Sequence, residues 1–251
     1  MQNKYNLGLV SVSFRGYSPE EIVKAMSAAG LNFIEWGSDI HAPYKDIEKL
    51  RYLADLQKAH GITCCSYGTY FKFGDTPISE LPDYINAAKI LGTDVLRLWC
   101  GKKSGADMTA EEREEMLTLC RKAAKIAEEQ GVTLCMECHK ATFTERTEDA
   151  LLLMREVNSP NFKMYWQPFQ WLEAEQNIEI AKAISPYAVH LHVFNWKGKL
   201  RFPLADAISE WQNYLSAFSG ERTLLLEFMP DDKIGSLSVE ADALRKIAGG
   251  I

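Results

Sequence analysis

Short apolar runs alternate with longer amphipathic stretches along the whole chain. Eight short apolar runs predict strands that begin near Leu7, Phe33, Thr63, Val95, Thr133, Phe162, Ala188 and Thr223. These starting points lie 26 to 38 residues apart, and a helical pattern follows each run. Because parallel strands need a crossover of this length, the pattern predicts a series of right-handed βα units.

The stretches between the strands carry signals for where helices begin and end. Ser18, followed by Pro19 and two glutamates, offers an N-cap, a proline at the first helical position and acids in the first turn. Thr109 and Glu112 have the spacing of a capping box, for a helix that ends at Gly131. Three earlier helices are expected to close at Gly30, Gly61 and Gly92.

The number and spacing of these units fit a closed barrel. A chain of 251 residues has the length at which eight βα units close on themselves. An open, doubly wound sheet is the structural alternative, and the lack of a Gly-x-Gly-x-x-Gly turn favours the barrel over it. No linker rich in proline or glycine interrupts the series. The expected fold class is α/β, a single (β/α)8 TIM-barrel domain over residues 1–251.

The net charge and the cysteines of the chain argue against several classes of protein. A net charge of −6 gives no attraction to nucleic acid or to an anionic membrane, and no apolar stretch reaches the roughly 20 residues that span a bilayer. The first residues run straight into a strand, so we expect no signal peptide. The six cysteines lack zinc-type pairs, and most lie in apolar runs, which indicates reduced thiols and a cytoplasmic protein. A homo-oligomer remains compatible with the sequence.

Ionisable side chains lie late in five of the apolar runs. In a barrel of this kind, reactive groups project from the carboxyl ends of the strands and from the loops that follow. The residues at such positions are Glu35 on the second run, Arg97 on the fourth, Glu137 and His139 on the fifth, His190 and His192 on the seventh, and Glu227 on the eighth. The sixth run ends in Gln167.

Three of these side chains form a candidate metal site. Glu227 lies in the apolar run Leu224–Met229, where a bare charge would be costly and needs a partner or a metal ion. Strand alternation allows Glu137, His192 and Glu227 to point into the barrel together. One imidazole and two carboxylates would then meet at the rim, a ligand set that suits Mn²⁺, Mg²⁺, Co²⁺ or Zn²⁺.

Other conspicuous residues have structural interpretations that compete with functional ones. His190 is interpreted as a hydrogen-bonded core histidine, and His60 as a residue at a helix end. Four strand ends carry tryptophans that suit either the core or the walls of a sugar pocket, and both interpretations stay open: Trp36, Trp99, Trp166 and Trp196. We expect the cations after the seventh strand to be solvated: Lys197, Lys199 and Arg201.

With these segments in place, the chain resembles the xylose isomerase-like TIM barrels, the sugar phosphate isomerase/epimerase superfamily that includes endonuclease IV. The segments that carry the resemblance are IEWGSDIHAP, SYGTYF, LCMECH, YWQP, HLHVFNW and LLLEF. In that superfamily Glu, Asp, His and Glu from strands five to eight hold the metal ion. Glu137, His192 and Glu227 match three of these positions, and Gln167 replaces the Asp. Gln170 replaces a histidine that often contacts substrate.

The resemblance implies a divalent-metal-dependent sugar isomerase or epimerase. A metal-stabilised cis-enediolate would form from a sugar, sugar phosphate or keto-polyol, with Glu137 and Glu227 transferring the proton. A neutral Gln167 removes one negative charge, so the metal ion is expected to be weakly bound. The expected substrate-binding residues are Glu35, His41, Tyr67, Arg97, Trp99, His139, Gln170 and Trp196.

Three other functions are weighed against this one. The loss of the Asp ligand is compatible with a non-catalytic sugar-binding protein or a subunit of a heteromeric sugar-processing enzyme. A lyase or dehydratase that uses the same enediolate cannot be separated from an isomerase by sequence. A DNA repair endonuclease of the same fold is disfavoured, because three zinc ions need more ligands than a chain with five histidines offers, and because the chain is acidic.

Overall fold

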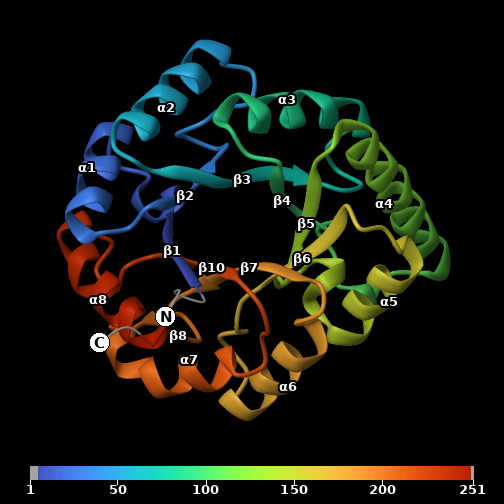
Figure 1. The fold of residues 1–251 in the computed structure, drawn as a ribbon. Helices are drawn as coiled ribbons and strands as arrows, with labels where there is room; N and C mark the ends of the chain where they lie inside the picture. The colour runs from blue at the N-terminus through green and yellow to red at the C-terminus, as the bar shows by residue number, and fades with distance from the viewer. Residues whose placement is uncertain (1–4, 250–251) are drawn as a thin grey trace.

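Eight parallel strands close into a barrel in the computed structural model, which describes residues 5–249 (Figure 1). Around the barrel the strand order is β1-β10-β7-β6-β5-β4-β3-β2. The strands are β1 (Tyr5–Val10), β2 (Phe33–Gly37), β3 (Thr63–Lys72), β4 (Val95–Trp99), β5 (Thr133–Glu137), β6 (Phe162–Trp166), β7 (Ala188–Val193) and β10 (Arg222–Leu226). All eight predicted strands are present, so the expected barrel is confirmed.

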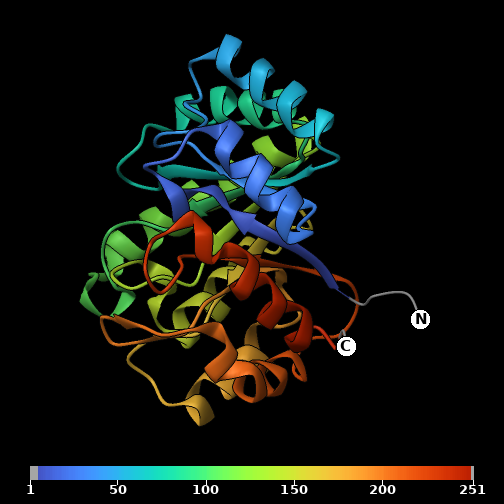
Figure 2. The same ribbon diagram turned by 90° about the vertical axis from the view of Figure 1, so that its left-hand side faces the viewer.

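The helices form an outer ring around the strands (Figure 1). They are α1 (Pro19–Ala29), α2 (Ile47–Ala59), α3 (Leu81–Leu91), α4 (Ala110–Gln130), α5 (Thr147–Val157), α6 (Ala174–Ile184), α7 (Ile208–Leu215) and α8 (Leu237–Ile247). Short 3-10 turns lie in the loops after the strands: η1 (Ser11–Phe14), η2 (Ile78–Glu80), η3 (Gly105–Asp107), η4 (Phe143–Glu145), η5 (Leu204–Ala207) and η6 (Ile234–Ser236). In the side view these loops gather at the left, opposite the start of β1 (Figure 2).

The predicted helix signals are found where expected. Ser18 and Glu21 form a capping box at α1, and Thr109 and Glu112 form one at α4. The glycines that close α1, α3 and α4 adopt the left-handed conformation that a residue with a Cβ atom disfavours. His60 is the residue at the end of α2, as interpreted.

A small antiparallel hairpin follows β7 and was not predicted. Its strands are β8 (Trp196–Lys197) and β9 (Leu200–Arg201). The apolar run predicts a strand that continues to Trp196, but β7 ends at Val193. The hairpin brings Trp196 and Arg201 opposite one another on the face where the strands end.

Strand alternation divides the core into two layers. Side chains that point inward form a small cluster inside the barrel, which contains Val10, Val12, Cys135, Tyr165 and Leu225. Those that point outward pack against the helices in a much larger cluster. The interior cluster fills the barrel below the carboxyl ends of the strands, so polar groups above it lie on a packed floor.

The same alternation separates the four strand-end tryptophans. Trp36 and Trp166 point outward and are fully buried, and Trp166 packs against Trp211 from α7. Trp99 and Trp196 instead line the cavity described below. The core interpretation is therefore confirmed for Trp36 and Trp166, whereas for Trp99 and Trp196 a role in sugar binding stays a prediction.

His190 lies inside the barrel, in agreement with its interpretation as a core histidine. Its Nε2 atom is 3.2 Å from the carbonyl oxygen of Cys65, and its ring meets that of Tyr165 edge to face. Burial lowers the pKa of His190 to about 4, so the imidazole is neutral at ordinary pH. Within residues 5–249, no helix has the length and apolar character needed to cross a membrane.

Candidate active site

A cavity of about 200 Å³ opens at the carboxyl ends of the strands. Its lining comes from the ends of strands and the loops after them: Val12, Arg15, Tyr70, Arg97, Trp99, Glu137, His139, Gln167, Gln170, Trp196, Glu227 and Phe228. This is the face on which enzymes of this architecture carry their reactive groups. A volume of this order suits a small molecule of about the size of a monosaccharide.

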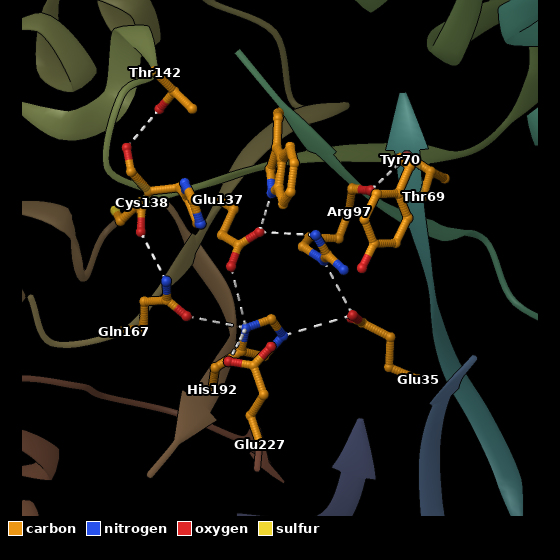
Figure 3. A network of polar contacts seen from close by, with 12 residues as sticks. Glu35, Thr69, Tyr70, Arg97, Glu137, Cys138, Thr142, Gln167, His192 and Glu227 are labelled. Carbon is orange, nitrogen blue, oxygen red and sulfur yellow. Dashed lines mark hydrogen bonds and ion pairs between the residues drawn. The ribbon is translucent and has the colours of Figure 1, made fainter. Parts of the chain in front are cut away.

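Three predicted metal ligands meet at the floor of this cavity (Figure 3). Glu137 ends β5, His192 lies on β7, and Glu227 directly follows β10; one ligand atom of each lies within 4.8 Å of the others. The Nδ1 atom of His192 is 3.6 Å from Glu137 Oε1 and 3.6 Å from Glu227 Oε2. All three side chains are buried.

Gln167 completes the group as a neutral fourth member. Its Nε2 donates a hydrogen bond of 3.1 Å to the carbonyl oxygen of Cys138, which fixes the orientation of the amide. Its Oε1 is thereby aimed at the site, 3.2 Å from Nδ1 of His192 (Figure 3). Two carboxylates, one imidazole nitrogen and one amide oxygen converge, and these donors fit a divalent cation such as Mn²⁺, Mg²⁺, Co²⁺ or Zn²⁺.

Oε2 of Glu137 accepts hydrogen bonds on the side that faces away from His192. Arg97 NH1 donates a hydrogen bond of 2.8 Å to Oε2, and the indole N–H of Trp99 donates to the same atom. Oε1 is left to face the site. Burial opposes ionisation of Glu137, but the charge of Arg97 and the contact with His192 outweigh it and hold its pKa well below the ordinary value.

Glu35 lies beneath the cavity, where it is fully buried and outside the lining. Arg97 Nε is 3.1 Å from its Oε1, and the hydroxyl of Ser66 donates a hydrogen bond of 2.5 Å to its Oε2. Burial would raise the pKa of Glu35, but Arg97, His192 and Ser66 together outweigh it and lower the pKa to about 2. Glu35 is therefore a charged group of the floor, and it does not reach the space where a substrate would bind.

The pKa values of Glu227 and His192 are raised, whereas that of Glu137 is lowered. Burial raises the pKa of Glu227, helped by the nearby charge of Glu137. For His192, burial favours the neutral ring, but Glu227 and the other carboxylates around it raise its pKa to about 10. In the metal-free protein the ring is thus an imidazolium, which must lose a proton before Nδ1 can bind a cation.

Besides Glu35, two more of the expected substrate-binding residues are placed away from the cavity, which corrects the expectation for all three. The hydroxyl of Tyr67 donates a hydrogen bond of 2.6 Å to the carbonyl oxygen of Ala42, on the outer side of the barrel. A bulge between β2 and β3 shifts the pairing by one residue, so Tyr67 faces outward. His41 is buried between Ser11 and the carbonyl oxygen of Tyr17, each 3.2 Å away.

Five other expected residues do line the cavity: Arg97, Trp99, His139, Gln170 and Trp196. The ring of His139 stacks on that of Trp99, with ring centres 4.8 Å apart. Arg97 contributes to the lining, yet its Nε and NH1 atoms are already bonded to Glu35 and Glu137. Its principal contacts are therefore with these two glutamates.

Sequence reasoning missed four lining residues: Val12, Arg15, Tyr70 and Phe228. Arg15 is held by Asp39 at 2.6 Å and donates to the hydroxyl of Tyr70. Phe228 has a φ of 56°, a left-handed conformation that is unusual for a bulky residue, and its N–H is bound by Ser13 Oγ at 2.8 Å. Their only sequence signal is position: Val12, Arg15 and Phe228 follow the ends of β1 and β10, and Tyr70 lies near the end of β3.

Aromatic rings stand on two sides of the cavity. Tyr70 meets Trp99 edge to face on one side, and Trp196 packs against Phe228 on the other. Arg201 lies 4.7 Å above both the Trp196 and Phe228 rings and pairs with Asp232. The expectation of a solvated loop therefore holds for Lys197, which is exposed and pairs with Glu210, but not for Arg201.

The sequence profile of the xylose isomerase-like TIM barrel family matches residues 23–228, and the chain belongs to this family. Over 229 residues it is 25% identical to a 3-dehydroshikimate dehydratase of Bacillus anthracis; the match covers 88% of this chain and 80% of that enzyme. The crystal structure of the probable 3-DHS dehydratase AsbF from Bacillus anthracis, involved in petrobactin synthesis, superposes with a TM-score of 0.78 at 18% identity, covering 95% of this chain and 98% of that one.

Two further solved structures share the fold. The IolI protein, with a bound zinc atom, superposes with a TM-score of 0.74 at 16% identity and covers 97% of this chain and 98% of its own. A D-psicose 3-epimerase with D-tagatose from Clostridium cellulolyticum H10 gives a TM-score of 0.69 at 15% identity, with 95% of this chain and 96% of that one covered. At these identities the superpositions establish the barrel architecture.

Proposed function

We propose that the chain is a divalent-metal-dependent isomerase or epimerase of a small sugar, sugar phosphate or keto-polyol. One observation carries the proposal: Glu137 and Glu227 approach Nδ1 of His192 from separate strands, each at 3.6 Å, on the floor of a monosaccharide-sized cavity. Moving a proton beside a carbonyl needs a base, an acid to return the proton, and stabilisation of the developing oxyanion. On the floor of the cavity, Glu137 and Glu227 would serve as the base and the acid. The candidate ligands there would hold a cation that stabilises the oxyanion.

The two glutamates differ in how readily they bind a proton. Burial raises the pKa of Glu227, whereas Arg97 and His192 lower that of Glu137 against the effect of burial. Carboxyl groups whose pKa values are pushed apart in this way are typical of an acid/base pair. We assign proton abstraction to Glu227, the stronger base. Return of that proton by Glu227 to the neighbouring carbon gives isomerisation. Epimerisation needs a proton at the opposite face, which Glu137 would deliver after taking one up from solvent, while the proton removed by Glu227 is released to solvent.

The cation would be held by Glu137, Gln167, His192 and Glu227. When bound, it would withdraw electron density from the substrate's carbonyl oxygen and so acidify the adjacent C–H. His192 must release the proton on Nδ1 to join this set, because its pKa in the metal-free protein is about 10. Arg97 and Trp99 hold one oxygen of Glu137 and leave the other for this role.

The remaining lining residues are suited to binding hydroxyl groups and sugar faces. His139 and Gln170, which carry polar groups, line the cavity, and so do the aromatic residues Trp99 and Trp196, whose side chains suit the C–H surfaces of a sugar. The relatives support a substrate of this kind, because a D-psicose 3-epimerase with D-tagatose shares the fold. This likeness supports a small carbohydrate as the substrate.

A dehydratase is the second candidate, and the match to the Bacillus anthracis 3-dehydroshikimate dehydratase favours it. The same abstraction by Glu227 would form an enediolate or enolate. The C–O bond of a hydroxyl on the next carbon would then break, and a proton delivered to that oxygen would let it leave as water. Isomerisation and dehydration therefore share their first step and differ in the fate of the electron pair.

Deuterium exchange tests the shared step. The chain would be incubated in D₂O with Mn²⁺ and a panel of ketoses, keto-inositols, sugar phosphates and 3-dehydroshikimate. We expect metal-dependent deuterium incorporation next to the carbonyl of at least one compound, and its loss in Glu227→Gln. Product analysis by NMR separates an isomer or epimer from a product that has lost water.

A matched control distinguishes loss of chemistry from loss of structure. Glu240 is also a buried glutamate, 5% exposed, but it binds the backbone N–H of Leu204 outside the cavity. Glu240→Gln should therefore keep the exchange activity. Measured sugar binding without exchange of any compound would contradict an enzyme and favour a non-catalytic sugar-binding protein.

A further inference from the structure

The side of His192 that faces away from the cavity meets a carboxylate. Nε2 of His192 is buried and, among residues 5–249, has no hydrogen-bond partner. Oε1 of Glu35 lies 3.6 Å from it, a few tenths of an ångström beyond a hydrogen bond (Figure 3). Nδ1, on the other side of the ring, faces Glu137, Gln167 and Glu227. The imidazole therefore lies between the candidate cation position and Glu35.

Glu35 is held rigidly in this position. Ser66 donates to one of its oxygens at 2.5 Å, and Arg97 Nε donates to the other at 3.1 Å. The same guanidinium binds Glu137 through NH1 at 2.8 Å. One buried arginine thus orients Glu137, a candidate ligand, and also Glu35, the carboxylate behind His192.

The neighbouring strand leaves space for this arrangement. A Cβ atom at Gly68 would lie 2.5 Å from Oε1 of Glu35 and 2.9 Å from NH2 of Arg97. Such approaches are too close for any side chain, so the pair occupies room that exists only because residue 68 is glycine. Gly68 is paired with Arg97 across β3 and β4, directly beside the network.

We propose that Glu35 is a positioning residue of the metal centre: its carboxylate accepts the N–H of His192 Nε2 and so directs the lone pair of Nδ1 toward the cation. This inference rests on the metal centre of the proposed function. The proton stays on Nε2 throughout, and Glu35 touches neither substrate nor cation. A carboxylate in this position also makes the imidazole a better electron donor, which strengthens cation binding.

The test compares Mn²⁺ affinity of the full chain and its variants by isothermal titration calorimetry. We expect Glu35→Gln to bind 10- to 100-fold more weakly than the wild type. Gly68→Ala should also bind more weakly, because its methyl group displaces Glu35. Two controls should keep wild-type affinity: Glu240→Gln, and Gly235→Ala, whose added Cβ meets nothing within 4 Å. Wild-type affinity in folded Glu35→Gln would overturn the proposal.

A second measurement needs no folded variant. In wild-type protein with ¹⁵N-labelled histidine and bound ¹¹³Cd²⁺, the one-bond coupling identifies the imidazole nitrogen that binds the ion. We expect coupling to Nδ1 and a retained proton on Nε2 of a single histidine. Coupling to Nε2 would overturn the proposal.

The outcomes for Glu35 and for the proposed function are separate. Weaker Mn²⁺ binding in Glu35→Gln without exchange of any substrate would reject the isomerase and keep the positioning role. Deuterium exchange of a substrate by the wild type, together with unchanged Mn²⁺ affinity in Glu35→Gln, would keep the isomerase and reject the positioning role. A wild-type chain that binds no divalent cation would overturn both.

Discussion

Arg97 NH1 lies 2.8 Å from Glu137 Oε2, and both side chains of this ion pair are almost completely buried. The guanidinium also binds Glu35, so one positive charge offsets two buried carboxylates. The sequence alone predicts that Arg97 binds substrate. Its contacts instead make it a structural centre for the floor of the cavity, and a change there has consequences for folding as well as for function.

Replacing Arg97 with methionine should destabilise the fold strongly. Methionine fills similar space but leaves Glu35 and Glu137 buried without the cation that lowers their pKa values. Removing one partner of a buried ion pair costs about 3–5 kcal/mol in the free energy of unfolding. Urea unfolding followed by circular dichroism checks this, with Arg121→Met as the control because Arg121 pairs with Glu114 and Glu156 on the exposed surface. A loss below about 1 kcal/mol, as for an exposed pair, would contradict this interpretation.

Restoring the missing charge at residue 167 should strengthen cation binding. Gln167 places a neutral oxygen 3.2 Å from Nδ1 of His192, where an isosteric glutamate would place a charged one. Gln167→Glu should therefore lower the Kd for Mn²⁺ by about tenfold or more, since hard cations bind more tightly as the ligand charge rises. Calorimetric titration measures it, and Gln170→Glu, at the cavity wall outside the four-residue ligand group, is the matched control. Unchanged affinity would mean that residue 167 does not contact the ion.

Much of this site could be predicted from alternation along single strands. Glu137, His192 and Glu227 face inward because they follow inward-facing positions at intervals of two, as Cys135 and Leu225 confirm from the interior cluster. Prediction from alternation fails where a β-bulge shifts the order of inward- and outward-facing residues. Because of the bulge beside Cys65, the side chain of Tyr67 points outward. Neither the residue types nor their spacing in the sequence predicts this bulge.

Loop residues could not be placed in this way, because their positions depend on contacts between distant parts of the chain. His41 is held by Ser11 and Tyr17, which lie more than 20 residues earlier. Arg15 reaches the cavity because Asp39 and Tyr70 hold it there. Such contacts follow from the closed barrel, which brings the loops after neighbouring strands together, and they become visible only in the structure.

The neutral His190 should make stability depend on pH in a defined direction. Its pKa is about 4 in the folded protein, below the ordinary value of 6.5, so the unfolded chain binds a proton between these values that the folded protein does not. The stability contributed by the neutral ring is present above pH 6.5 and is lost as pH falls toward 4. His190→Gln should reduce the loss over this range by about 3 kcal/mol. Unfolding at a series of pH values with chelator present measures it, and an equal loss in the wild type and in His190→Gln would contradict the prediction.

Phe228 offers a test of backbone strain next to Glu227. Its φ of 56° is a conformation that glycine adopts freely and other residues adopt at a cost. Phe228→Gly and Phe228→Ala both remove the ring that packs against Trp196, but only alanine keeps the unfavourable φ. We expect the glycine variant to be more stable than the alanine variant by about 1 kcal/mol in urea unfolding, after the greater freedom of unfolded glycine is taken into account. Both should lose substrate affinity equally, because both open the same wall of the cavity. An alanine variant at least as stable as the glycine variant would show that the left-handed backbone at this position is not strained.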